Sequence, residues 1–201
     1  MKKIILPLLA AASLLGVSAT AVAADGTWLP TTGTGNWTVS GNWTGGTIPG
    51  SNSTTTNGDT ANFGTLTGAM GVRYDLNRNI KNISLANNSA FVYTFSTSVS
   101  GSLLLSSGGS INKTAGNGTD AFNNTGIIQI QGDGGNYTFT NTGVGGLQIA
   151  TTVSGVSTAG NTTTLYLNGN NTTSNNVVNN VIHSRPIGNA KKGRGMMDGE
   201  F

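Results

Sequence analysis

Short runs of apolar, β-branched or aromatic residues recur along the chain from Gly71 onward, with clusters of turn-forming residues between them. Apart from wider gaps near Ile111 and Val156, their centres lie roughly 9 to 12 residues apart, a spacing typical of short strands joined by turns. This pattern favours a β-sandwich or a β-solenoid. The runs are 72–76, 80–85, 91–95, 103–105, 127–130, 137–139, 147–149, 165–167 and 177–182.

Strand length and turn chemistry favour the solenoid. Runs such as Leu103–Leu105 and Leu165–Leu167 are shorter than the strands of a typical sandwich. Pairs of asparagines between runs suit left-handed bends and stacked side-chain amides. The sequence therefore predicts an all-β, parallel β-helical solenoid over residues 71–184, with a β-sandwich as the alternative. The asparagine pairs are 87–88, 123–124, 170–171 and 179–180.

Composition supports a β-rich fold with little helix. Gly, Thr, Asn and Ser supply 104 of the 201 residues, and these types are poor helix formers. Only 8% of the residues are charged, against about 25% in ordinary soluble domains. The chain has no Cys and a single His, His183, which excludes disulfides, a cysteine nucleophile and a Cys/His zinc site.

The net charge of +3 is concentrated at the two ends of the chain. Residues 25–184 contain five Asp against two Arg and two Lys, so the body is nearly neutral. It has no basic stripe that would bind phosphates, and nucleic acid is therefore not an expected partner.

The segment 1–24 has the features of a secretory signal peptide. Lys2 and Lys3 precede an apolar stretch over 4–17, and small residues permit cleavage after Ala23 or Ala24. The apolar stretch is shorter than the roughly 20 residues of a membrane-spanning helix. We therefore expect a secreted or cell-surface protein without an integral membrane span in its mature form.

The segment 25–70 contains few aliphatic side chains but all three tryptophans, Trp28, Trp37 and Trp43. We interpret this segment as an irregular cap that covers the open first rung of the solenoid. The alternative is a platform on which the indole rings stack against sugars, with asparagine amides bonding the sugar hydroxyls.

The same segment resembles the amino-terminal region of bacterial autotransporter-associated β-strand repeat proteins. The resemblance lies in Thr27–Trp28, Gly35–Trp37, Asn42–Trp43, Ile48–Gly50 and Asn57–Gly64, and similar strands extend it to Ile182. It implies a right-handed parallel β-helix in a large secreted or surface protein. Members of this family often serve as stalks or adhesive passengers.

The chain has few candidates for catalysis or metal binding. Glycan-cleaving β-helix enzymes need clustered carboxylates, and the best local group is Asp75 with Arg73, Arg78 and Lys81, which we interpret as a solvated cross-strand pair. The turns at 57–59 and 132–135 are similar to calcium-binding turns, but neither is repeated in tandem. We predict neither a cofactor nor a metal.

The segment 185–201 differs abruptly from the body, with six charges and no Ser or Thr. We expect this tail to be disordered and the repeat array to be interrupted there, as in a truncated reading frame. The last predicted strand, Val177–Ile182, is then an uncapped edge through which chains could self-associate.

Together these features predict a non-enzymatic, secreted β-helical protein of the structural or adhesin type. A glycan-binding module that uses the three tryptophans is the second interpretation. A polysaccharide lyase or hydrolase is the third, and the scarcity of carboxylates argues against it. An extracellular or cell-surface polysaccharide is the expected partner.

Overall fold

The computed structural model describes residues 23–52, 57–74, 77–97, 101–123, 126–131, 134–155, 163–171, 173–174, 176–182 and 191–192. These stretches contain fourteen strands of one sheet, two short 3-10 helices and no α-helix. The strands are β1 (Gly26–Thr27), β2 (Gly33–Asn36), β3 (Thr60–Phe63), β4 (Met70–Tyr74), β5 (Arg78–Leu85), β6 (Tyr93–Thr97), β7 (Ser102–Lys113), β8 (Asp120–Phe122), β9 (Ile127–Ile130), β10 (Asn136–Asn141), β11 (Leu147–Gly155), β12 (Thr164–Gly169), β13 (Val177–Ile182) and β14 (Lys191–Lys192).

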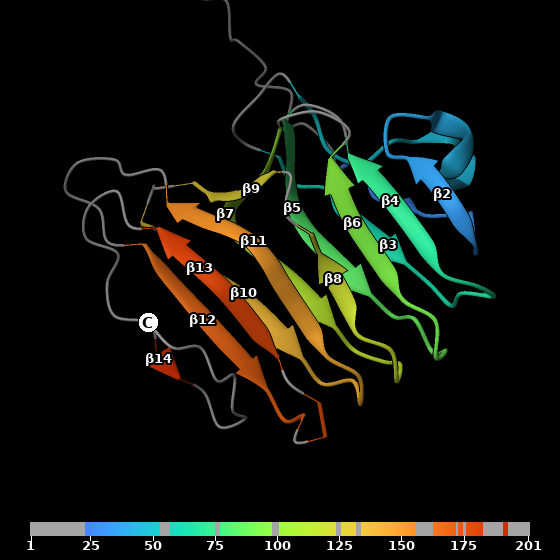
Figure 1. Cartoon of the computed structure of the whole chain (residues 1–201). Helices are drawn as coiled ribbons and strands as arrows, with labels where there is room; N and C mark the ends of the chain where they lie inside the picture. The colour runs from blue at the N-terminus through green and yellow to red at the C-terminus, as the bar shows by residue number, and fades with distance from the viewer. Residues whose placement is uncertain are drawn as a thin grey trace, which may run out of the picture.

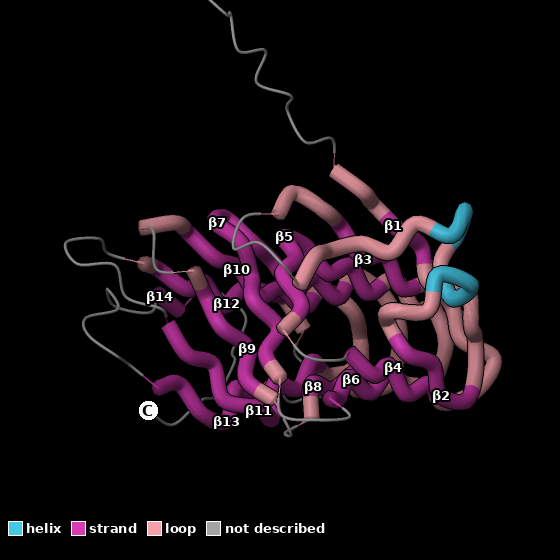
Figure 2. The backbone as a smooth tube through the Cα atoms, turned by 90° about the horizontal axis from the view of Figure 1, so that it is seen from above, coloured by secondary structure: helices cyan, strands magenta, loops and turns pink. Residues whose placement is uncertain are grey.

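The strands form a parallel β-solenoid with three faces. Face A contains β1 and β3, the second parts of β5 and β7, and the whole of β10, β12 and β14. Face B contains β2, β4, β6, β8 and the first part of β11 and of β13. Face C contains the first parts of β5 and β7, the whole of β9, and the second parts of β11 and β13. Figure 1 shows the strands stacked side by side, and Figure 2 shows faces A and B as two opposite rows.

Parallel pairing places residues from successive coils in columns. On face A, Asn82, Ser110, Thr138 and Tyr166 are aligned at a constant interval along the chain. On face C, Arg78, Leu103, Ile128 and Val153 are aligned at a constant but shorter interval. The observed fold confirms the predicted parallel solenoid, and it excludes the β-sandwich.

The core lies inside the coil, because alternate residues of each strand point inward. In β11 buried and half-buried positions alternate along the whole strand. One inward column of face B runs through Val72, Phe95, Phe122 and Ile149, and the rings of Phe95 and Phe122 stack with centroids 4.5 Å apart. Burial of each large apolar side chain contributes about 1.5–3 kcal/mol. Burial of this core is therefore a large favourable term in the stability of the fold.

Glycines allow the corners between faces A and B to stack closely. Gly116 has a φ of +93°, and a Cβ there would overlap the carbonyl oxygen of Asn87 in the preceding coil. A Cβ on Gly145 would overlap the carbonyl oxygen of Gly118 in the same way. Glycine is therefore required at these corners, because the backbones of successive coils are in direct contact there and leave no room for a side chain.

The tryptophan-containing segment lies at the amino-terminal end of the solenoid. It contributes β1 and β2, the first strands of faces A and B, together with the 3-10 helices η1 (Ser40–Asn42) and η2 (Thr44–Gly46). Figure 1 shows these helical turns beside β2, beyond the stacked strands. This position is the one that the cap interpretation predicts.

Two predicted segments lie largely outside the described residues. Of the predicted signal peptide, only Ala23 and Ala24 are described. Of the predicted disordered tail, only β14 is described, and it pairs with β12 on face A. No helix within the described stretches is long and apolar enough to cross a membrane.

Candidate functional site

The three tryptophans form one buried cluster around Phe63 of β3. Trp28, Trp37 and Trp43 are 4%, 0% and 1% exposed. Their ring centroids lie 5.6–5.8 Å from that of Phe63, and Trp43 lies 5.0 Å from Trp28 and 5.1 Å from Trp37. Such edge-to-face and tilted contacts are favourable for aromatic pairs. The cluster closes the amino-terminal end of the core.

Hydrogen bonds hold two of the indoles inside the cap. The Trp37 Nε1–H donates to the carbonyl oxygen of Pro49 at 2.8 Å, and the Trp43 Nε1–H donates to that of Trp37 at 2.7 Å. A sugar-stacking platform needs an exposed ring face, and the burial of these rings leaves none. The geometry therefore favours the cap role of the three tryptophans over glycan contact.

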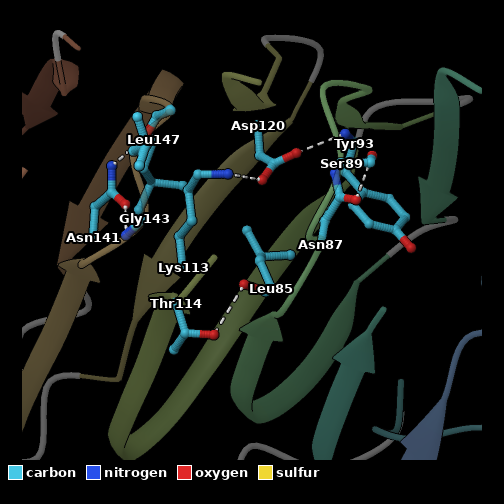
Figure 3. A network of polar contacts seen from close by, with 12 residues as sticks. Leu85, Asn87, Ser89, Tyr93, Lys113, Thr114, Asp120, Asn141, Gly143 and Leu147 are labelled. Atoms are coloured by element: carbon cyan, nitrogen blue, oxygen red, sulfur yellow. Dashed lines mark hydrogen bonds and ion pairs between the residues drawn. The ribbon is translucent and has the colours of Figure 1, made fainter. Parts of the chain in front are cut away.

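A buried ion pair occupies the corner between faces A and B (Figure 3). The Lys113 Nζ lies 2.5 Å from the Asp120 Oδ2, and both side chains are fully buried. The other carboxylate oxygen of Asp120 accepts from the backbone N–H of Tyr93 at 2.7 Å. Burial raises the pKa of Asp120, and the Lys113 ammonium and the Tyr93 N–H partly offset the rise. Lys113, Asp120 and the Tyr93 N–H thereby link the end of β7 to the starts of β8 and β6.

Buried asparagines continue this polar corner into the next coils. Asn141 follows Lys113 in the face A column, and its amide donates to the Gly145 carbonyl at 2.8 Å and to the Asn176 Oδ1 at 2.6 Å. The Asn176 Oδ1 also accepts from the Leu147 N–H at 2.9 Å. These buried amide groups are thereby satisfied by the corner backbone and by each other, as stability requires. The network has a structural role.

The outward side of face A is an array of polar side chains, all small except that of Tyr166, which we call the polar face. All its members are uncharged and half-buried. Neighbours in the array bond to one another: the Ser110 hydroxyl donates to the Asn82 Oδ1 at 2.9 Å, and the Asn112 amide donates to the Ser110 Oγ at 3.0 Å. The members are Thr60, Asn62, Asn82, Ser84, Ser110, Asn112, Thr138, Thr140, Tyr166 and Asn168.

The spacing of the polar face is set by the sheet. Adjacent strands are about 4.8 Å apart, and outward residues of one strand are about 7 Å apart. This surface was not predicted from the sequence, although polar–apolar–polar triplets such as Thr60–Asn62 and Asn82–Ser84 are visible there. The triplets become a surface only when the register of the coils is known.

The other sequence candidates do not form a common site among the described residues. Asp75, Asp133 and His183 lie outside the described stretches. Arg73 is exposed on β4, whereas the buried Arg78 donates from Nη1 to the Gly50 carbonyl at 3.1 Å. No group of three metal-ligating side chains occurs in the described part of the chain.

No family model matches the chain, and no characterised protein or solved structure shows significant similarity to it.

We expect that Trp37→Ala lowers the free energy of unfolding by about 3–5 kcal/mol, because it opens a cavity in the aromatic cluster. The control is Val39→Ala in the same cap, where Val39 is 47% exposed and the change is within about 0.5 kcal/mol. Urea denaturation measures both. Unchanged stability with loss of polysaccharide binding would contradict the cap role and favour the glycan interpretation.

We expect that Lys113→Met lowers the free energy of unfolding by about 3–5 kcal/mol, because it leaves the Asp120 carboxylate buried without its cation. Adding Asp120→Asn recovers about 1–3 kcal/mol, since the amide oxygen still accepts from Tyr93 without carrying a charge. The control is Lys81→Met at a half-buried lysine, with a loss below about 1 kcal/mol. Equal losses for the two lysine variants in urea denaturation would refute the role of the ion pair.

Proposed function

We propose that the chain is a secreted or cell-surface, non-enzymatic β-solenoid of the adhesin type, related to the autotransporter-associated β-strand repeat proteins. In this proposal the coil is a rigid spacer and the polar face is the adhesive surface. The single observation that carries the adhesive part is the continuity of the polar face over successive coils, from β3 to β12.

The chemistry of the polar face suits an extracellular polysaccharide. Hydroxyl and amide groups can both donate to and accept from sugar hydroxyls. An uncharged array has no attraction for phosphates, which argues against nucleic acid. Tyr166 adds one aromatic ring of the kind that packs on pyranose rings. A regular array on a rigid support can engage a repeating polymer at several points, so weak contacts add up to useful avidity.

The roles of the described carboxylates support a non-enzymatic function. Asp25 accepts from the Thr60 N–H at 2.7 Å, and Asp59 accepts from the N–H groups of Ala24 and Gly50, each at 2.7 Å. Asp120 is sealed in the corner with Lys113. All three therefore hold the fold through hydrogen bonds or an ion pair.

Charge introduced into the polar face tests the proposal. We expect that Ser110→Lys with Thr138→Lys, at two aligned positions, weakens binding to insoluble polysaccharides such as cellulose or chitin by tenfold or more, which is about 1.4 kcal/mol. The two lysines occupy the array and repel each other across adjacent strands. Co-sedimentation of the mature chain with each polymer measures the binding.

The matched control places the same kind of change on face C. Gln129→Lys with Ser154→Lys alters aligned, half-buried outward positions and leaves the polar face intact. We expect this control to bind like the unmodified chain. Equal binding by the two double variants would refute the assignment of the polar face.

A further inference from the structure

A carboxylate at the base of the cap faces the backbone nitrogen of Ala24. The Asp59 Oδ1 accepts from this nitrogen at 2.7 Å, and Asp59 is only 6% exposed. The Oδ2 atom accepts from the Gly50 N–H at 2.7 Å and from the Asn57 amide at 3.2 Å. The Asn57 Oδ1 accepts in turn from the Asp59 N–H at 2.7 Å. The carboxylate is thus fixed in position from several sides.

The sequence permits cleavage of the leader after Ala23 or after Ala24, and the two products differ at this carboxylate. Hydrolysis of the Ala23–Ala24 bond consumes one water and leaves a carboxylate on Ala23 and an α-amine on Ala24. This amine has a pKa of about 8 in unperturbed peptides and is protonated at neutral pH. Hydrolysis one residue later removes the nitrogen that Asp59 binds.

We propose that the chain is processed between Ala23 and Ala24 and that Asp59 binds the new α-ammonium group of Ala24. This inference rests on the proposed export of the chain. Processing turns a neutral amide donor into a cation at the same place, and charge-assisted hydrogen bonds are roughly twice as strong as neutral ones. Ala23 is exposed beside Gly58, so removal of the residues before Ala24 leaves the bond to Asp59 intact.

The capture of the new terminus explains how a very short first strand is held. The two residues of β1 pair with Ala61 and Asn62 of β3. Asp25, the residue before β1, is held by the hydrogen bond that its carboxylate accepts from the Thr60 N–H. Ala24 is held by the hydrogen bond that its backbone nitrogen donates to Asp59. The terminus is thereby tied at two consecutive residues, and processing strengthens the tie at Ala24 by placing a positive charge on its nitrogen.

Sequencing of the secreted product tests the cleavage position. The full chain is expressed with its own leader in a bacterial host, and the amino terminus of the exported protein is read by Edman degradation and intact mass. We expect the sequence Ala24-Asp25-Gly26. A product that begins at Asp25 or later overturns the inference while leaving export intact. Absence of any processed product contradicts both the inference and the proposed export.

A second experiment tests the partner of the terminus. Mature chains that begin at Ala24 are prepared with a free or an acetylated α-amine, and their thermal unfolding is compared. We expect acetylation to lower the melting temperature by about 2–4 °C. The effect should vanish in Asp59→Asn and persist in the matched control Asp25→Asn.

Two results would overturn the role of Asp59. One is an absence of any effect of acetylation on the unmodified chain. The other is the same effect in Asp59→Asn. If Asp59→Asn does not fold, the chain that begins at Asp25 replaces it, and its melting temperature should match or fall below that of the acetylated chain. A higher value refutes the inference.

Discussion

In-register parallel pairing between successive coils is the interaction on which the rest of the structure depends. It satisfies the backbone of each strand and aligns like positions into columns, so inward residues make one continuous core and outward residues make continuous surfaces. The stacked rings of Phe95 and Phe122, the stacked corner at Gly116 and the polar face all follow from this alignment. Because the pairing is a backbone property, it tolerates very different side chains within one column.

The sequence predicted the fold class because short strands, small turn residues and scarce charge all favour a solenoid. It did not reveal the register. The columns of face A repeat at a longer interval than those of face C, so the corners between them lengthen from coil to coil. The column of Ile83, Ile111, Phe139 and Leu167 also keeps its apolar character while the residue type changes. Packing preserves only the apolar character at these positions, so a comparison of residue identities does not detect the repeat.

The candidate sites show the same division between local and non-local information. The tryptophans were recognised from composition, but their burial around Phe63 depends on how the cap folds over β3. Lys113 and Asp120 are close in the sequence and look like ordinary surface charges, yet the corner turns both inward. The polar face does not exist until the strands of face A are in register. Function in this chain is thus proposed from surfaces that pairing creates.

A register-specific disulfide tests the stacked solenoid most directly, because the chain contains no cysteine of its own. Asn112 and Thr140 are aligned on adjacent strands of face A, and strands about 4.8 Å apart allow a disulfide. The account predicts that Asn112→Cys with Thr140→Cys forms an intramolecular disulfide on mild oxidation, whereas Asn112→Cys with Gln129→Cys, on faces A and C, does not. A disulfide in the second variant and none in the first would contradict the register on which the account is built.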